Sequence, residues 1–321
     1  MGSIFTVSIL QSALELGCIY ALVALALFVS FSILNIADLS TDGCFTLGCA
    51  VCAMVTIQGH PILALAAAML AGVCSGFITA FLQTKLGIES ILAGIIVNTG
   101  LYTINIAVMG FASQVNLFNC NTIFTMAKNA IGGGWYKLIM AALIVLVIGV
   151  ILSAFLNTRL GLSIRATGDN ADMVKASSIN PSFTITVGLC VANAMTALSG
   201  GVLAQYQKSC DINLGTGMVT IALASLIIGE SIIGKGSMFR RVLGVVLGSC
   251  LYRFLVAVAL RLNVPAEALK LVSAIIVAIA IAFPFLKKKA AFVRQKSAAQ
   301  KKLKDNMRLA EANTKEMGGD R

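Results

Sequence analysis

The side chains with the most chemical potential in this sequence are polar groups embedded in long apolar stretches. Asn98, Tyr102 and Asn105 lie at i, i+4 and i+7, so they share one face of any helix that carries them. Four more polar residues gather where a first apolar segment meets a short second one: Asn35, Asp38, Thr41 and Asp42. Polar groups at membrane depth are costly and usually face a bundle interior or a water-filled cavity. All seven are therefore candidates either for hydrogen bonds between helices or for the lining of a solute path.

No grouping typical of catalysis accompanies these residues. His60 is the only histidine, which rules out a histidine-based metal or acid–base site. Residues 229–236 read GESIIGKG and come close to a phosphate-binding loop. However, Gly236 replaces the hydroxyl residue that ligates magnesium, and an apolar segment precedes the loop instead of a strand. We therefore expect a chain that is not an enzyme and binds no cofactor or metal, so any ATP and magnesium would be bound by a partner.

The composition shows what must position these residues. The 321-residue chain is 58% hydrophobic and 12% charged, whereas a soluble domain has about a quarter charged residues. A transmembrane helix needs about 20 apolar residues, and apolar stretches of this length recur along the sequence. The prediction is an all-α, polytopic membrane protein with eight or nine transmembrane helices, near 16–34, 43–58, 61–83, 90–111, 136–156, 182–204, 215–233, 241–260 and 266–286. The second stretch is short enough to be re-entrant, and Met1–Glu15 could be a helix lying along the membrane interface.

Lys and Arg accumulate on the cytoplasmic side of membrane proteins. Most of them fall there if the polar segment 159–183 and the C-terminus are cytoplasmic. We expect a transmembrane permease domain over residues 1–286 and a basic cytoplasmic tail over 287–321, which would favour anionic lipids and not nucleic acid. Arg253 lies inside an apolar stretch and needs a partner, for which Glu230 is a candidate by charge. Cys120 and Cys210 fall in loops on the opposite side, where a disulfide could form.

Glycine spacing predicts two close helix contacts. Gly72 and Gly76 are four residues apart, as are Gly244 and Gly248, so each pair places small residues on one helix face. The expected role is packing within the chain, and a subunit interface is the alternative.

The polar segment 159–183 reads RLGLSIRATGDNADMVKASSINPSF and separates two long uncharged stretches. Asp169 and Asn170 suit a helix start, and ADMVKAS continues as about two turns. Pro181 suits the first turn of the next helix. A short surface helix held at both ends by membrane helices could transmit a displacement from a partner.

These residues resemble a known family. GLSIRATGDNADMVKASSINP, followed by an apolar helix ending in ALSGG, is similar to the coupling segment of permease subunits from ABC importers. The branched-chain amino acid type permeases, which include a tryptophan/tyrosine uptake subgroup, give the best likeness. LNIADLSTDGCFTLGCAV and IALASLIIGESIIG resemble other parts of that family, and the likeness covers roughly residues 16–286. Where relatives often carry a Leu-Gly-like pair, this chain has Ser177 and Ser178.

The resemblance implies a permease homodimer in the bacterial plasma membrane, two cytoplasmic ATPase subunits and an extracytoplasmic solute-binding protein. The ATPases would press on the coupling helix, and the bundle would pass a small polar solute, an amino acid of aromatic or branched-chain type. The residues expected to contact the ATPase are Arg165, Ala166, Thr167, Gly168, Asp169, Asn170, Met173 and Lys175.

Three alternatives remain open from the sequence. A sugar or nucleoside ABC permease would share the fold and the ATPase partner. An ion-coupled carrier would need carboxylates at membrane depth, and Asp42 and Glu230 are the few available. A membrane-embedded enzyme would need a catalytic cluster that the sequence does not offer.

Overall fold

A computed structural model describes residues 7–234 and 236–261, together with 271, 274–275, 278–279 and 282. These residues are predominantly helical, as the composition predicts. The helices of the first half are α1 (Val7–Leu27), the π-helix η1 (Phe28–Ile33), α2 (Thr41–Ile57), α3 (Pro61–Thr84), α4 (Ser90–Val108) and α5 (Ile123–Ile131). Those of the second half are α6 (Tyr136–Leu156), α7 (Arg159–Asp169), α8 (Ala171–Ala176), α9 (Pro181–Gln207), α10 (Met218–Ile233) and α11 (Met238–Arg261).

Six of the described helices are long and apolar enough to cross a membrane: α1 with η1, α3, α4, α6, α9 and α11. The expected eight or nine crossings are therefore not confirmed. Helices α2 and α10 have 17 and 16 residues, about 25 Å of helix against a hydrocarbon core of about 30 Å. The ninth expected crossing, 266–286, lies largely outside the described residues, as does the tail 287–321. The expected interfacial helix over Met1–Glu15 is wrong for its described part, because α1 runs without a break from Val7.

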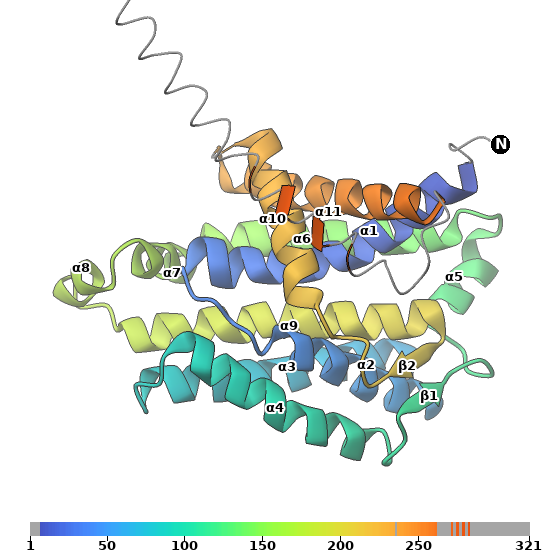
Figure 1. Ribbon diagram of the computed structural model, residues 1–321, viewed down its shortest axis with the longest axis horizontal. Helices are drawn as coiled ribbons and strands as arrows, with labels where there is room; N and C mark the ends of the chain where they lie inside the picture. The colour runs from blue at the N-terminus through green and yellow to red at the C-terminus, as the bar shows by residue number, and fades with distance from the viewer. Residues whose placement is uncertain are drawn as a thin grey trace, which may run out of the picture. The chain divides into compact units, whose positions relative to one another are not determined.

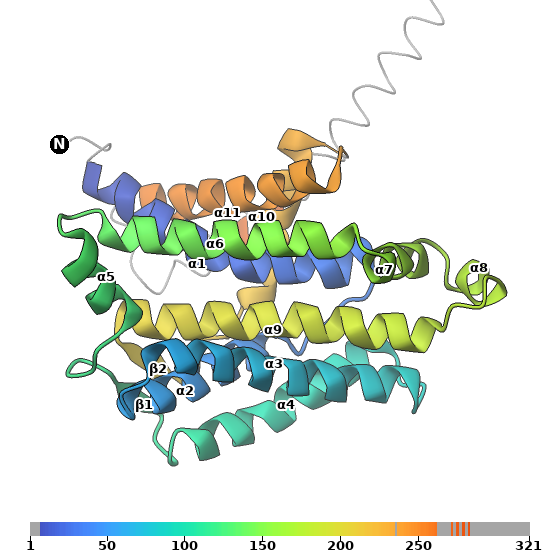
Figure 2. The ribbon, with the colours of Figure 1, turned by 180° about the vertical axis from the view of Figure 1, so that it is seen from behind.

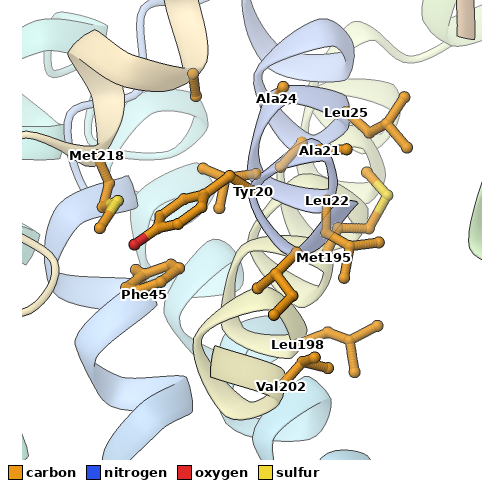
Figure 3. Packing of buried hydrophobic residues seen from close by; sticks show 14 of the residues in the cluster. Tyr20, Ala21, Leu22, Ala24, Leu25, Phe45, Met195, Leu198, Val202 and Met218 are labelled. Atoms are coloured by element: carbon orange, nitrogen blue, oxygen red, sulfur yellow. The ribbon is translucent and has the colours of Figure 1, made fainter. Parts of the chain in front are cut away.

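The core is built around α1 and α9. In the most apolar stretch of each of these helices 83% of the residues are buried, compared with 28–39% in α3, α4, α6 and α11. Figure 3 shows Tyr20 of α1 pointing towards Phe45 of α2 and Met218 of α10. The rings of Tyr20 and Phe45 are stacked, with centroids 6.2 Å apart and planes 8° apart. These two helices, together with the largely buried α2, form the centre of the bundle, and the longer outer helices present one face outward.

The two glycine pairs lie at helix contacts within the chain, as predicted. A Cβ on Gly72 or Gly76 would clash with the α9 backbone, and a Cβ on Gly248 would clash with the α10 backbone; Gly244 also lies against α10. Small residues let these helices approach closely. Helix α3 is thereby fixed to the central α9, and α10 is paired with α11.

Surface elements gather at opposite ends of the bundle. Figures 1 and 2 show α7 and α8 at one end and α5, β1 and β2 at the other. The strands β1 (Gln114–Asn116) and β2 (Ser209–Asp211) form an antiparallel ribbon that the all-α prediction missed, with Val115 opposite Cys210. Cys120 and Cys210 are both free thiols here, and the Cys210 sulfur lies 4.0 Å from that of Met109. The possible disulfide between Cys120 and Cys210 is not formed in this structure.

Candidate functional site

A polar cavity lies where α2 and α10 begin side by side. The carboxylate of Asp42, in the first turn of α2, accepts a hydrogen bond from the Gly217 amide at 2.9 Å and another from the Val219 amide at 2.9 Å. Thr46, one turn further along α2, accepts from the Gly215 amide at 3.1 Å. An acidic side chain suits this position because unpaired amides and the helix dipole make helix N-termini electropositive. Asp42 therefore holds the starts of two short helices together.

The cavity has a volume of about 440 Å³, within the range of about 300–1,000 Å³ that is common for small-molecule sites. It opens between α2, α4 and the loop before α10. Hydroxyl and amide groups dominate its lining, which consists of Asp42, Gly43, Thr46, Asn98, Thr99, Tyr102, Thr103, Asn105, Ile212, Asn213 and Thr216. Four of the seven predicted path residues thus come together: Asp42, Asn98, Tyr102 and Asn105.

Asn105 is the most deeply placed polar residue of the cavity, with 1% of its surface exposed. Its amide nitrogen donates to the carbonyl oxygen of Gly43 at 3.1 Å. This bond fixes the orientation of the amide, because only the nitrogen end can donate to a carbonyl. The other end, Oδ1, is buried without a hydrogen-bond partner among the described residues. Buried polar atoms are nearly always satisfied, so this oxygen can accept a hydrogen bond from a donor other than the described residues.

The other three predicted path residues do not line this cavity. Asp38 is 2% exposed and accepts hydrogen bonds from the amide and hydroxyl of Ser40 at 2.8 and 2.6 Å, and from the side chain of Asn193 at 2.8 Å. Thr41 donates to the Asp38 carbonyl oxygen at 3.0 Å. Asn35 takes a left-handed backbone, with φ 57°. Asp38 and Thr41 stabilise the non-helical link between η1 and α2, in which Asn35 also lies, and such a link can exist inside the bundle when its polar groups are satisfied.

At the other end of the bundle, the predicted coupling segment forms two helices, where one was expected. Thr158 caps α7 by accepting from the Gly161 amide at 3.2 Å. Asn170 ends α7 and caps α8, accepting from the amides of Asp172 and Met173 at 3.1 Å each. Asn180 and Pro181 start α9 in the expected way. The first helix went unnoticed because its glycines and small polar residues have modest helix propensity.

The eight residues predicted to contact an ATPase divide into two groups. Asp169, Asn170, Met173 and Lys175 are exposed, and Arg165 and Ala166 are half-buried. Thr167 and Gly168 face the bundle. The Thr167 hydroxyl lies 2.7 Å from that of Thr184 on α9, and a Cβ on Gly168 would clash with the Ile33 carbonyl oxygen. The exposed residues offer a surface for a partner, and the buried pair anchors α7 to η1 and α9.

A polar cluster that the sequence analysis missed ties η1 to α10 and α11. Glu230 accepts from the Ser32 hydroxyl at 2.6 Å and from the Arg241 guanidinium at 2.8 Å, and Arg241 also donates to Ser32 at 2.9 Å. The guanidinium lies 4.8 Å from the Phe28 ring centroid. The expected Glu230–Arg253 pair is therefore wrong. Eleven residues separate Glu230 from Arg241, across the turn from α10 to α11, and helix spacing alone could not reveal their contact.

Arg253 instead places its guanidinium 3.5 Å from the centroid of the Tyr20 ring. A cation above an aromatic face is stabilised by the negative potential of the ring. The partner of this cation is thus aromatic, which a search for opposite charges could not find.

Apolar spanning helices, a polar cavity and an exposed two-helix segment define a multi-pass membrane transport protein. The family described as branched-chain amino acid transport system / permease component matches residues 9–282. The chain therefore belongs to this family of ABC transporter permeases. Its members are transport subunits and not enzymes, which agrees with the lack of a catalytic grouping in the sequence.

Individual relatives agree with this assignment. Over 267 residues the chain is 32% identical to the tyrosine transport system permease protein of Clostridioides difficile (strain R20291), which covers 83% of this chain and 88% of that protein. It is 30% identical over 278 residues to an uncharacterized protein of Rickettsia prowazekii (strain Madrid E), covering 85% and 97%. The ribose import permease protein of Escherichia coli (strain K12) is 25% identical over 259 residues, covering 78% and 77%.

Proposed function

We propose that this chain is the membrane-spanning permease subunit of a binding-protein-dependent ABC importer for an amino acid, of aromatic or branched-chain type. ATP hydrolysis with magnesium would take place in partner ATPase subunits, and an extracytoplasmic binding protein would deliver the solute. The observation that carries the proposal is a polar cavity at the starts of two short helices, in a chain 32% identical to a tyrosine permease. Interrupted helices at membrane depth commonly frame solute sites in transporters.

The segment over α7 and α8 is the proposed contact for the ATPase. Its exposed residues lie at the end of the bundle opposite β1 and β2 (Figure 1), and its buried residues contact η1. The η1 helix leads directly into the link that ends at Asp42. A displacement of α7 would therefore reach the cavity through a short run of chain. We propose that α7, α8 and the C-terminus lie on the cytoplasmic side of the bacterial plasma membrane, the side on which Lys and Arg accumulate.

The open side of the cavity favours a homodimer. Tyr102 is 52% exposed, and Thr99 and Thr103 are exposed beside it on α4. Hydroxyl groups on a helix at membrane depth are unfavourable against lipid. Because these groups both donate and accept hydrogen bonds and carry no charge, a second copy could pair with them around a two-fold axis. We infer that α4 faces the second permease copy across the solute path.

The proposal is tested by uptake of labelled L-tyrosine, L-leucine and ribose in cells that express the permease with its neighbouring ATPase and binding protein. Amino acid uptake should require ATP and persist when the ion gradients are dissipated. Uptake that survives ATP depletion and stops with the ion gradients would favour an ion-coupled carrier. Ribose uptake without amino acid uptake would favour the sugar permease, which the 25% identity to a ribose permease keeps as second candidate.

Charge reversal tests the coupling segment. Arg165→Glu and Asp169→Lys should each reduce uptake at least about tenfold, because a reversed charge at a protein interface costs roughly 1.4 kcal/mol or more. The amount of permease in the membrane should not change. Lys85→Glu is the control, since Lys85 is exposed after α3 and outside the segment. Normal uptake by both segment variants, or an equal loss in the control, would remove the segment from the mechanism.

A further inference from the structure

We propose that Asp42 and Asn105 form a subsite that binds the ammonium group of the solute. The inference rests on the proposed function, since it assumes that the cavity between α2, α4 and α10 receives an amino acid. It adds which end of the amino acid the protein recognises, and with which atoms.

Charge is the first argument. Asp42 is the single charged side chain among the described residues that line the cavity. Each of its two oxygens accepts one backbone hydrogen bond, from Gly217 and from Val219. A carboxylate offers about four acceptor positions, so each oxygen can take one more donor. The two amides hold the carboxylate in place, which lowers the entropy that a ligand would lose on binding it.

The unpaired oxygen of Asn105 is the second, independent argument. The donor end of this side chain is committed to the Gly43 carbonyl, and its acceptor end is buried without a partner among the described residues. Leaving a buried acceptor unsatisfied is unfavourable, because the atom has lost its bonds to water. Asn105 is also one of the residues that line the cavity. A donor from the solute would satisfy this oxygen.

The backbone places the two acceptors near each other. Asn105 bonds to Gly43, the residue directly after Asp42, and both side chains line the same cavity. A primary ammonium carries three N–H donors and can serve a carboxylate and an amide oxygen together. A charged donor also gives stronger hydrogen bonds than a hydroxyl group.

The lining offers no comparable site for the carboxylate of the solute. None of the described lining residues is Lys, Arg or His. The starts of α2 and α10 would attract an anion, but Asp42 already occupies that position. The solute carboxylate and side chain must therefore rely on neutral hydroxyl and amide groups such as those of Thr99, Tyr102 and Asn213. We expect the cavity to discriminate strongly for the ammonium group and weakly for the carboxylate.

The test is a ligand series on the purified full-length permease in lipid nanodiscs, measured by titration calorimetry without a binding protein. The probes are L-tyrosine, tyramine, which lacks the carboxylate, and 3-(4-hydroxyphenyl)propionate, which lacks the ammonium. Tyramine should bind within about threefold of L-tyrosine, and the propionate at least about tenfold more weakly, as one lost charge-assisted hydrogen bond predicts. Equal or tighter binding of the propionate would overturn the subsite, and so would the failure of all three to bind.

Variants separate recognition from folding. Asn105→Leu keeps the volume of the side chain and removes its oxygen, and it should weaken tyramine and L-tyrosine alike by about tenfold. Asp42→Asn should do the same where the protein still folds, as judged by thermal unfolding. Asn157→Leu is the control, because Asn157 ends α6 and bonds to the Ser153 carbonyl outside the cavity. Unchanged binding in Asn105→Leu would contradict the proposal. Absence of ATP-dependent amino acid uptake by the unmodified permease would contradict the proposed function instead.

Discussion

The coupling segment and the cavity are joined to the bundle in different ways. The contact of α7 with η1 is made by backbone, because Gly168 lies directly against the Ile33 carbonyl. At the cavity, side-chain hydrogen bonds such as those of Asp42 with the α10 amides add to the backbone contact of Gly215 with the Asp42 carbonyl. A backbone contact leaves no rotamer that can absorb a displacement, whereas side-chain contacts can form and break. The difference teaches that the molecule is stiff where force would enter and adjustable where a solute would bind.

Between these two regions lies the cluster of Ser32, Glu230 and Arg241. It connects η1, which contacts α7, with α10, whose first residues bind Asp42. The cluster shares features with both regions, since it is made by side chains yet is largely buried, with 15% of the Arg241 and 26% of the Glu230 side chain exposed. A displacement of α7 and η1 could therefore reach α10 and the cavity through the hydrogen bonds of this cluster.

The largest expected effect is at the backbone contact. Gly168→Ala places a methyl group against the Ile33 carbonyl and should push α7 away from η1. Overpacking of this kind costs about 1–3 kcal/mol or more. We expect uptake to fall at least about tenfold and the thermal unfolding temperature to drop. Gly134→Ala is the control, because a Cβ on this glycine between α5 and α6 meets nothing within 4 Å. Normal uptake in Gly168→Ala would show that the contact is not needed for coupling.

A smaller loss is expected at the polar cluster. Arg241→Ala leaves the Glu230 carboxylate largely buried without its cation and should destabilise the protein by roughly 2–4 kcal/mol, less any relief from solvent access. The ion pair of Lys175 with Asp172 is the comparison, at 3.5 Å with side chains 65% and 93% exposed. Lys175→Ala should cost no more than about 0.5 kcal/mol. Chemical denaturation in detergent measures both.

A second readout distinguishes a structural cluster from a coupling one. Arg241→Lys keeps the charge and should retain most of the stability. If the cluster carries motion, the amount of solute taken up per ATP hydrolysed should fall in Arg241→Ala and recover in Arg241→Lys. Equal ratios in all three proteins would assign the cluster to stability alone.

Much of this arrangement could be predicted from local sequence. Helix periodicity placed Asn98, Tyr102 and Asn105 on one face, and the structure confirms that they share a cavity with Asp42. Capping rules placed the start of α8 near Asp169 and Asn170, and Pro181 placed the start of α9. These predictions succeeded because they depend on residues within one or two helical turns of each other.

The parts that could not be predicted depend on contacts between distant segments. Asn213 and Thr216 line the cavity because the loop before α10 folds back onto Asp42. In this contact Asp42 bonds to Gly217, which lies 175 residues further along the chain. In the sequence, Asp38 and Asp42 are both aspartates in the junction between the first two apolar segments, and nothing distinguishes their roles. Asp38 is instead held by internal hydrogen bonds from Ser40 and from Asn193, which lies 155 residues away along the chain. Spacing along a helix carries no information on such encounters.

The smallest expected effect lies in the exposed half of the coupling segment. Ser178, between α8 and α9, has a left-handed backbone with φ 59°, a conformation that costs a side-chain-bearing residue roughly 1–2 kcal/mol and glycine nothing. Glycine also raises the conformational entropy of the unfolded chain, which offsets part of this gain. Ser178→Gly should therefore stabilise the protein by about 0.5 kcal/mol. Uptake should stay unchanged, because α7 keeps its contact with η1. A gain in stability without loss of transport would show that only α7 must be held rigidly for coupling. A loss of transport would show that the connection between α8 and α9 must be rigid as well.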